Sequence, residues 1–393
     1  MIRRSEYATT TEYGDYDAFG QPGYRIEAAG TPEAQRTDYL YDPRFRGKPQ
    51  RVRSASVYPG GERIETFRYD DQGRTLEHTL SGYDPDGQAL SRTYRFEYHE
   101  PFGQLSLIDG PRTDVDDTTR YEYYPDDTAE GPNRGRLRRI IDANGLVVRD
   151  ELQYSATGKV LSERRPNDLV IVNTYYPGNY RLASRSETSG GVSRVTRWTY
   201  LPSGEPESVT TDAGTAVATT ISFVYDAARR LVGIRDALGN RIEFTLDSEG
   251  NVLEEQTVAP DGMLGKQLTR RFDAYNRLDT LQQANERLDY DYAPDSTLRR
   301  TENAQGVVTT YTYDALLRLV GQVQDVNGIQ AWIGYDYDTQ NRLIRVTDAN
   351  ANPTDYGYDD LDNLLVLTSP DTGTEVRRYD AAGNLRQRTD AKG

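Results

Sequence analysis

The stretch Tyr337-Asp338-Thr339-Gln340-Asn341-Arg342-Leu343 decides the fold of this chain, because its pattern recurs along nearly the whole sequence. The pattern is an aromatic residue, an aspartate, two variable positions, a glycine or asparagine, an arginine and a leucine. The clearest copies begin at Tyr69, Tyr225, Phe272, Tyr313, Tyr337 and Tyr379. Weaker copies begin near Tyr16, Tyr41, Tyr98, Tyr123, Tyr154, Tyr176, Tyr200, Leu246, Tyr292 and Tyr358. The chain therefore holds about 16 copies, spaced about 20 to 31 residues apart and most regular after Tyr292.

A second signature, Asp-x-x-Gly, lies between the copies. It occurs at 142–145, 236–239, 325–328 and 390–393. The segments between the two kinds of turn alternate: Tyr311 and Tyr313 face one side, and residues 319, 321 and 323 share a face. Alternation of this kind predicts strands, and sustained helical periodicity is missing. Each repeat is therefore predicted to be a β-hairpin.

The turn chemistry explains the spacing inside each copy. The aspartate accepts hydrogen bonds from backbone N–H groups two residues on, and glycine or asparagine supplies the positive φ of a type I turn with a G1 bulge. Residues that fit this role are Gly73, Gly158, Gly204, Gly250, Asn276, Asn341 and Gly383. Arg229 and Leu317 do not fit, so we expect their turns to differ or to carry strain.

These motifs resemble the YD/RHS repeat family, found in bacterial Rhs proteins, insecticidal toxin-complex shell proteins and teneurins. The resemblance covers nearly all of residues 10–393; it is highly specific from Tyr225 onward and looser from Tyr98 to Tyr200, where Gly131–Gly135 closes an irregular acidic insertion. It implies that hairpins add sideways into one long sheet, which spirals into a hollow shell, often around a toxic C-terminal domain. The family's C-terminal aspartyl autoprotease motif is missing from this sequence, as are toxin and plug domains. We therefore expect a single repeat array over 1–393, irregular over 1–224 and most regular over 225–393, without self-cleavage or toxicity of its own.

Strand geometry leads independently to part of this picture. About 32 strands at about 4.8 Å each make a sheet about 150 Å wide, and open twisted sheets rarely exceed about 10 strands without curling. Rolled once, the sheet encloses a bore of about 50 Å, too wide for side chains to fill. The predicted fold is all-β, a curled wall around empty space. Stacked tyrosines are expected to add about 0.2–1 kcal/mol per cross-strand pair while their hydroxyls reach water.

Composition excludes several classes of function. The net charge is −15, from 62 acidic and 47 basic residues, so a phosphate-binding surface is not expected. The chain has no cysteine and therefore neither disulfides nor thiolate metal sites. The one near match to a glycosylation sequon, at Asn352, is blocked by Pro353. These two absences favour a bacterial chain. No signal peptide or membrane span is seen, but the chain begins and ends inside the repeating pattern, so we expect it to be a segment of a secreted or cell-surface protein.

Most isolated polar clusters have an ordinary structural explanation. His78 and His99 lie in different repeats without a catalytic motif, and zinc is not expected. Asp84–Gly87 and the acidic insertion lack the spacing and closing glutamate of a calcium loop. That insertion contains Asp114, Asp116, Asp117, Asp126 and Asp127. Gly60-Gly61 and Gly190-Gly191 are expected to be hairpin turns, and Trp198 and Trp332 to be packing residues.

The recurring residues are interpreted as structural. Asp226, Asp314 and Asp338 are expected to cap turns. Arg230, Arg318 and Arg342 are expected to pair with neighbouring acids or to stack on tyrosines. The repeat-signature residues are Tyr69, Asp70, Gly73, Tyr225, Asp226, Phe272, Asp273, Asn276, Tyr313, Asp314, Arg318, Tyr337, Asp338, Asn341, Arg342, Tyr379, Asp380 and Gly383. No catalytic residue, cofactor or metal ligand is predicted.

Two functions remain open from the sequence. The first is a structural shell segment of a bacterial Rhs-type toxin, with a C-terminal toxin domain as its protein cargo and flanking shell or plug domains as partners. The alternative is an extracellular adhesion or carbohydrate-binding module, in which tyrosine faces stack on glycans. An enzyme is a distant third. The first and last hairpins leave unpaired sheet edges, which are expected to promote dimerisation or aggregation.

Overall fold

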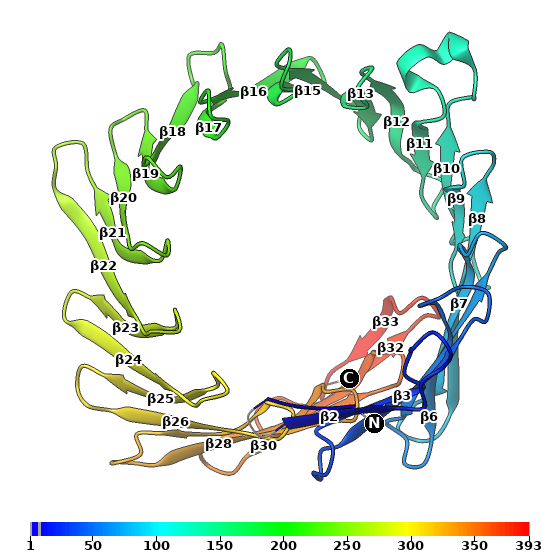
Figure 1. The fold of residues 1–393 in the computed structure, drawn as a ribbon, viewed down its shortest axis with the longest axis vertical. Helices are drawn as coiled ribbons and strands as arrows, with labels where there is room; N and C mark the ends of the chain where they lie inside the picture. The colour runs from blue at the N-terminus through cyan, green and yellow to red at the C-terminus, as the bar shows by residue number, and fades with distance from the viewer. Residues whose placement is uncertain (1, 7–8, 393) are drawn as a thin grey trace. The chain divides into compact units, whose positions relative to one another are not determined.

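The computed structural model describes residues 2–6 and 9–392 and is built from antiparallel β-strands (Figure 1). The all-β class and the tandem hairpin repeats predicted from the sequence are confirmed. Gly393, the last residue of the Asp-x-x-Gly copy at 390–393, lies outside the described residues. The chain divides into two units, one made of residues 1–118 and 291–393 and the other of residues 119–290.

Unit 1 contains two runs of strands, which we name the N-terminal arm (described residues up to 118) and the C-terminal arm (residues 291–392). The strands of the N-terminal arm are β1 (Ile2–Glu6), β2 (Thr9–Gly14), β3 (Tyr24–Glu27), β4 (Gln35–Tyr41), β5 (Pro49–Ala55), β6 (Glu62–Tyr69), β7 (Thr75–Tyr83), β8 (Ala89–His99) and β9 (Gln104–Asp109). The strands of the C-terminal arm are β25 (Leu298–Asn303), β26 (Val308–Tyr313), β27 (Leu319–Gln324), β28 (Ala331–Tyr337), β29 (Leu343–Thr347), β30 (Pro353–Tyr358), β31 (Leu364–Ser369), β32 (Gly373–Tyr379) and β33 (Leu385–Thr389).

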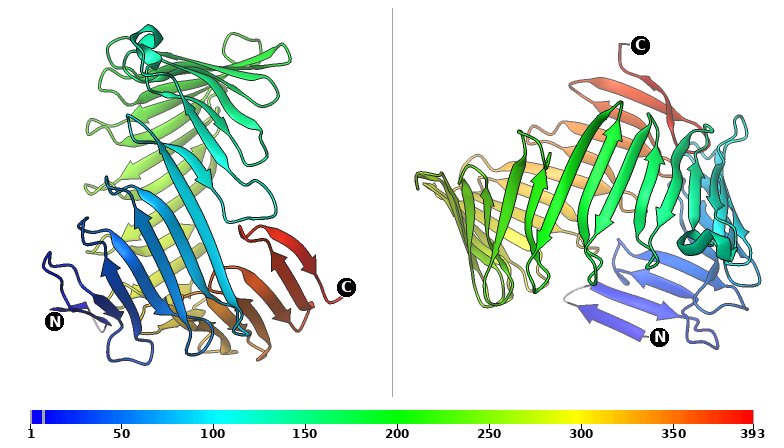
Figure 2. Two further views of the ribbon diagram at one scale, coloured as in Figure 1. Left: turned by 90° about the vertical axis from the view of Figure 1, so that its right-hand side faces the viewer. Right: turned by 90° about the horizontal axis from the view of Figure 1, so that it is seen from above.

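Unit 2 is one bent row of strands (Figures 1 and 2). Its first strands are β10 (Thr119–Tyr123), β11 (Leu137–Ile141), β12 (Val147–Tyr154), β13 (Val160–Arg165), β14 (Leu169–Tyr175), β15 (Leu182–Ser189), β16 (Val192–Tyr200) and β17 (Pro206–Thr211). They continue with β18 (Thr219–Tyr225), β19 (Leu231–Asp236), β20 (Arg241–Leu246), β21 (Val252–Val258), β22 (Leu264–Phe272), β23 (Leu278–Gln283) and β24 (Glu286–Tyr292), whose last two residues belong to unit 1. The 3-10 helix η1 (Thr128–Asn133) lies in the acidic insertion and is the one helical element among the described residues.

Consecutive strands pair antiparallel, and a bulge marks the signature aromatic residue. In the β28–β29 hairpin the register shifts between Asp336 and Tyr337, so that Tyr337 lies opposite Leu343. Asn341 adopts φ 64° in the same turn. The same shift occurs at Tyr225, Phe272, Tyr313, Tyr358 and Tyr379. The bulge and the left-handed turn residue predicted from the sequence are confirmed.

Arg229 and Leu317 have the same turn geometry as the glycines and asparagines at that position. Their φ angles are 63° and 60°, and Leu317 N–H donates to the Asp314 carbonyl at 3.0 Å. The two alternatives from the sequence are thus resolved: the turns do not differ, and the backbone strain falls on residues with a Cβ.

The Asp-x-x-Gly turns are less uniform than the sequence predicts. Gly145 and Gly239 have positive φ, but in the copy at 325–328 the positive φ falls on Asp325 and Gln330 instead of Gly328. A longer loop closes there, because Gln330 N–H also donates to the Asp325 carbonyl. The copy at 390–393 ends on Gly393, outside the described residues.

The interior is thin, as expected for a sheet whose faces are not covered by helices. Leu152 and Ile171 are the large apolar side chains that are almost fully buried, at 1% exposure. Asp360 is also fully buried, at 0%. No helix in residues 2–6 and 9–392 is long and apolar enough to cross a membrane.

Candidate functional site

The signature residues form a clamp that begins inside one turn. Oδ1 of Asp338 accepts hydrogen bonds from the backbone N–H groups of Gln340 and Arg342, both at 2.9 Å. Its other oxygen receives Nε of Arg342 at 2.8 Å. One carboxylate therefore holds both the turn backbone and the arginine side chain.

The arginine then reaches the next repeat. The Arg342 guanidinium lies 4.6 Å from the Tyr358 ring centre, and its Nη1 donates to the Asp359 carbonyl at 2.8 Å. Arg318 repeats the arrangement one hairpin earlier, paired with Asp314 at 2.7 Å and stacked on the next signature tyrosine at 4.8 Å. The sequence offered acid pairing or tyrosine stacking, and the structure has both at once.

The tyrosine hydroxyls close the clamp, which corrects the expectation that they reach water. Tyr337 donates its hydroxyl hydrogen to the Leu319 carbonyl in the preceding repeat at 2.8 Å, and Tyr379 does the same with Leu364. Ring-on-ring stacking is also less general than predicted, because a guanidinium covers the ring in several repeats. In both cases the acceptor is the leucine that lies opposite the preceding signature tyrosine, beside the bulge.

Burial and hydrogen bonding shift the ionisation of clamp residues. Burial raises the pKa of Tyr337 and Tyr358, because desolvation disfavours the phenolate. The backbone N–H of Arg230 is the main cause that lowers the pKa of Asp226 below its ordinary value. In these repeats, hydrogen bonds favour the charged form of Asp226, and burial favours the neutral form of Tyr337 and Tyr358.

The other signature residues occupy the matching positions. Tyr69 donates to the Pro49 carbonyl at 2.8 Å, and Asp70 accepts from Gln72 N–H at 2.9 Å. Asp273 pairs with Arg277 at 2.7 Å. Positive φ is found at Gly73, Asn276, Asn341 and Gly383. Tyr225, Phe272 and Tyr313 end β18, β22 and β26.

The isolated candidates lie in strands and turns. His78 stacks on Phe67, with ring centres 4.5 Å apart, and its Nε2 lies 3.4 Å from Glu65. Asp84 accepts backbone N–H bonds within its own turn. His99 ends β8 opposite Gln104. In the described part of the chain, no three His, Cys, Asp or Glu side chains are grouped so that they could hold a metal ion.

The two tryptophans differ in exposure. Trp332 is 49% exposed, and its indole lies over Gly334 and beside Gly321, where a Cβ would meet it. Trp198 is half-buried in β16. Trp332 therefore covers the backbone of these glycines at the surface and does not fill a core.

A second cluster, which the sequence did not predict, joins the two arms of unit 1, and we name it the seam. At its centre the buried carboxylate of Asp360 accepts hydrogen bonds from the backbone N–H of Val57 at 2.9 Å and of Tyr83 at 2.7 Å. Ser56 adds its hydroxyl, and the backbone N–H of Asp360 donates to the Tyr83 carbonyl at 2.9 Å. A Cβ at Gly82 would collide with this carboxylate, so only glycine permits the approach.

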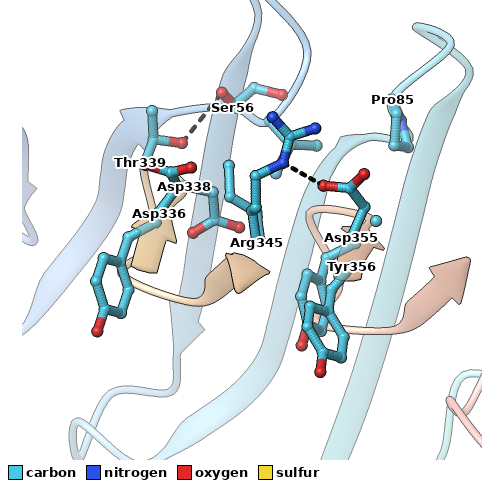
Figure 3. Close-up of a pocket in the computed structure, with 13 residues that line it drawn as sticks. Ser56, Pro85, Asp336, Asp338, Thr339, Arg345, Asp355 and Tyr356 are labelled. Atoms are coloured by element: carbon cyan, nitrogen blue, oxygen red, sulfur yellow. Dashed lines mark hydrogen bonds and ion pairs between the residues drawn. The ribbon is translucent and has the colours of Figure 1, made fainter. Parts of the chain in front are cut away.

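The preceding signature turn, residues 338–341, docks beside Asp360. Thr339 donates its hydroxyl hydrogen to the Ser56 carbonyl at 3.2 Å, drawn in Figure 3. Gln340 donates its side-chain N–H to the Ala55 carbonyl at 2.6 Å. A pocket of about 650 Å³ opens on the seam, lined in part by Ser56, Arg345 and Tyr356 (Figure 3).

Arginines extend the seam along the turns of the C-terminal arm. Arg92 in β8 donates to the carbonyls of Ala381 at 3.1 Å and Leu361 at 3.4 Å. Arg112 approaches Asp380 to 3.4 Å. At the exposed rim, Arg63 pairs with Asp362 at 2.9 Å. Three successive signature turns of one arm are therefore fastened to the other arm.

Sequence reasoning missed Asp360 because its position in the repeat is variable. Ala227 and Ala274 stand at the same place in other copies, and so does Asp71, whose side chain is fully exposed. The one available signal is a second aspartate beside the capping Asp359, and Asp71 shows that this signal alone does not identify a buried contact.

The fold and the clamp together define a tandem β-hairpin repeat protein of the YD type. The RHS Repeat family model matches residues 337–374, which contain the copies beginning at Tyr337 and Tyr358. The resemblance to the YD/RHS repeat family is confirmed: the chain carries RHS repeats.

Two of the known proteins that resemble this chain bear the names of toxins. Double-stranded DNA deaminase toxin A of Burkholderia cenocepacia (strain H111) is 28% identical over 427 residues, which cover 98% of this chain and 27% of that protein. The crystal structure of TcdB2-TccC3-TEV superposes with a TM-score of 0.71 at 15% identity, over 98% of this chain and 24% of that one. The Photorhabdus luminescens Tc holotoxin pore gives 0.65 at 15% identity, over 98% and 21%. At this identity the structures show the fold alone, and the chain spans about a quarter of the length of these relatives.

Proposed function

We propose that this chain is a wall segment of a bacterial Rhs-type toxin shell, which encloses a C-terminal effector domain of the protein it belongs to. The seam carries the proposal. A wall that winds past its own beginning needs later repeats to dock on earlier ones, and in unit 1 the Asp360 turn docks on Ser56, Val57 and Tyr83.

The clamp supports the same role. Each clamp ties a turn to the following hairpin through an ion pair, a stacked ring and a hydroxyl bond, so the wall resists opening between repeats. The work of these residues is structural, and the chain acts as a container without a reaction of its own. In this proposal residues 1–393 form one repeat array.

The relatives support a toxin setting. One bears the name of a DNA deaminase toxin and another is a Tc holotoxin pore, and this chain matches about a quarter of each. Secretion or display on a bacterial surface follows from that setting, with the effector and the flanking shell or plug domains as protein partners.

Contacts of several signature tyrosines do not favour carbohydrate binding. A sugar that stacks on a signature tyrosine needs an open ring face, and guanidinium groups cover faces of Tyr98, Tyr337 and Tyr358.

Limited proteolysis of a longer protein, in which an effector domain follows the array, tests the proposal. The effector is expected to survive protease concentrations that degrade the same domain expressed alone. Asp360→Ala, which removes the centre of the seam, should expose it, whereas Asp71→Ala, at the same repeat position but fully exposed, should not. An effector digested as fast inside the wild-type protein as in isolation contradicts the proposal.

A further inference from the structure

Two neighbouring signature turns of unit 2 lack the capping aspartate. They are residues 155–159, which join β12 to β13, and residues 176–181, which join β14 to β15; the four strands are consecutive in the row of unit 2 (Figure 1). Ser155 holds the aspartate position of the first turn, and its hydroxyl accepts the backbone N–H of Lys159 at 3.1 Å. Tyr176 holds the same position in the second turn. Both turns therefore lack the carboxylate that binds the basic residue of a clamp.

The basic residue of the first turn is consequently left without an acid. Lys159 stands where Arg342 stands in its clamp, but no carboxylate lies within ion-pair distance of it in the part of the chain that the structure describes. The next signature tyrosine, Tyr175, is also not covered by a cation among these residues. In the neighbouring repeats, Arg136 and Arg181 do stack on the next signature tyrosine, at 5.3 and 5.4 Å. This repeat therefore has both a free charge and an uncovered ring.

A pocket of about 330 Å³ opens between the two turns. Mostly apolar groups line it, among them Ala156, Leu161, Tyr175, Tyr176, Pro177 and Tyr180. Lys159, which is exposed, is the one charged residue among the described residues of the lining. By contrast, the pocket on the seam is lined by three aspartates, at 336, 338 and 355. In a chain with a net charge of −15, this pocket therefore combines aromatic walls with a positive charge.

The chemistry of the lining defines the ligand. The hydroxyls of Tyr175 and Tyr176 already donate to the carbonyls of Val160 and Trp198, both at 2.9 Å, so they are not available as donors to the hydroxyls of a sugar. Their rings can pack on a flat apolar group, and the Lys159 ammonium attracts an anion. The volume lies at the lower end of ligand pockets. We propose that the pocket binds a small aromatic acid, whose ring packs on the tyrosines and whose carboxylate pairs with Lys159.

NMR of methylated lysines tests the proposal, which does not depend on the proposed function. The chain has four lysines, Lys48, Lys159, Lys266 and Lys392, and reductive dimethylation with ¹³C-formaldehyde keeps their charge. Phenylacetate should shift the Lys159 signal with a dissociation constant of about 1 mM, because the ligand has few atoms. Lys266, which is exposed on β22 of the same unit, should not respond. Benzyl alcohol lacks the charge and acetate lacks the ring, so each should bind at least about fivefold more weakly.

Three variants, measured by ligand-observed NMR, separate binding from folding. K159M removes the charge and should weaken phenylacetate binding at least about fivefold, whereas the matched control K266M should bind as the wild type does. Tyr180 has φ 55° and is 49% exposed. Y180G therefore removes one wall of the pocket and also relieves backbone strain. It should weaken binding by a similar factor while its melting temperature equals or exceeds that of the wild type.

The proposal is overturned if phenylacetate leaves the Lys159 signal unchanged or if acetate shifts it as strongly as phenylacetate does. It is also overturned if K159M and Y180G bind phenylacetate like the wild type. Binding of N-acetyl-aspartyl-phenylalaninamide at least about tenfold tighter than phenylacetate would assign the pocket to a polypeptide instead of a small acid.

Discussion

The backbone N–H of Tyr83 donates a hydrogen bond of 2.7 Å to the carboxylate of Asp360, 277 positions later in the sequence. The carboxylate is fully buried, and its partners at Ser56, Val57 and Tyr83 are neutral groups. Burial of a charge is tolerated when hydrogen bonds satisfy its oxygens, and removal of the acceptor leaves its donors without a partner.

Asp360→Ala is therefore expected to destabilise unit 1 by about 2–6 kcal/mol, because the N–H groups of Val57 and Tyr83 each lose an acceptor at about 1–3 kcal/mol. Urea denaturation followed by tryptophan fluorescence measures the change. Asp71→Ala is the matched control, since Asp71 stands at the same repeat position as Asp360 but is fully exposed and pairs with Arg44 at 3.3 Å, so its loss should leave stability nearly unchanged. Equal effects of the two substitutions would show that the buried carboxylate is not the centre of the seam.

Gly82→Ala tests the same seam from the other side. A Cβ at this position would occupy the space of the Asp360 carboxylate, so we expect a loss of about 1–3 kcal/mol from overpacking. The double variant Gly82→Ala/Asp360→Ala should lose less than the sum of the two single losses, because the collision disappears with the carboxylate. Strict additivity in the double-mutant cycle would contradict this contact.

Leu317→Gly is expected to stabilise the protein by about 0.5–1 kcal/mol. Leu317 has φ 60°, which glycine adopts without the Cβ penalty, and its side chain is 43% exposed. Thermal melting measures the gain. Asn341→Gly, with φ 64°, should change stability less, since asparagine already tolerates this region. Destabilisation by Leu317→Gly would mean that packing of the leucine side chain contributes more stability than the backbone strain at this position costs.

Tyr337→Phe removes the hydroxyl that donates to the Leu319 carbonyl and should cost about 1 kcal/mol. Tyr275→Phe, at a ring 80% exposed, should stay within about 0.5 kcal/mol of the wild type. Chemical denaturation of both variants side by side gives the comparison. If Tyr337→Phe leaves the stability unchanged, the clamp depends on the stacking of Arg318 on the ring and not on the hydroxyl hydrogen bond.

Acid is expected to unfold the repeats. Backbone N–H groups of Arg230, Arg277 and Asn352 are the largest causes that hold the pKa values of Asp226, Asp273 and Asp348 below 3.8. A lowered folded-state pKa adds stability that is present above 3.8 and is lost as the pH falls through the folded values.

The free energy of unfolding should therefore be steady from pH 7 to about pH 5 and fall steeply below about pH 4. Denaturation series at constant ionic strength measure it. Asp226→Asn keeps a side-chain oxygen for the turn but has no carboxylate to protonate. The free energy of unfolding of this variant should therefore fall less in acid than that of the wild type. Stability that is flat down to pH 3 would contradict this role of the aspartates.

The local part of the structure could be predicted from the sequence, and the long-range part could not. The positions of Asp338, Asn341 and Arg342 follow from turn chemistry within seven residues, so one repeat predicts the others. The sequence predicts that tyrosine hydroxyls reach water, whereas the Tyr337 hydroxyl donates to the Leu319 carbonyl. This acceptor lies in the preceding repeat, and residue spacing does not indicate such a contact.

The seam is harder still to predict. Asp360 becomes a buried acceptor only because the C-terminal arm lies against Tyr83, and Asp71 at the same repeat position is fully exposed. Docking between distant repeats depends on how the sheet bends, which the residues of a single turn do not determine. The sequence therefore predicts the repeat but not the contacts between arms.

Amide hydrogen exchange at Val57 and Tyr83 tests the central claim most directly. If the later repeats dock on the earlier ones through Asp360, both amides exchange slowly in the wild type and at least about tenfold faster in Asp360→Ala, with no such change in Asp71→Ala, whose side chain is fully exposed. Exchange of both amides in the wild-type protein at the rate of unprotected turn residues would contradict the account.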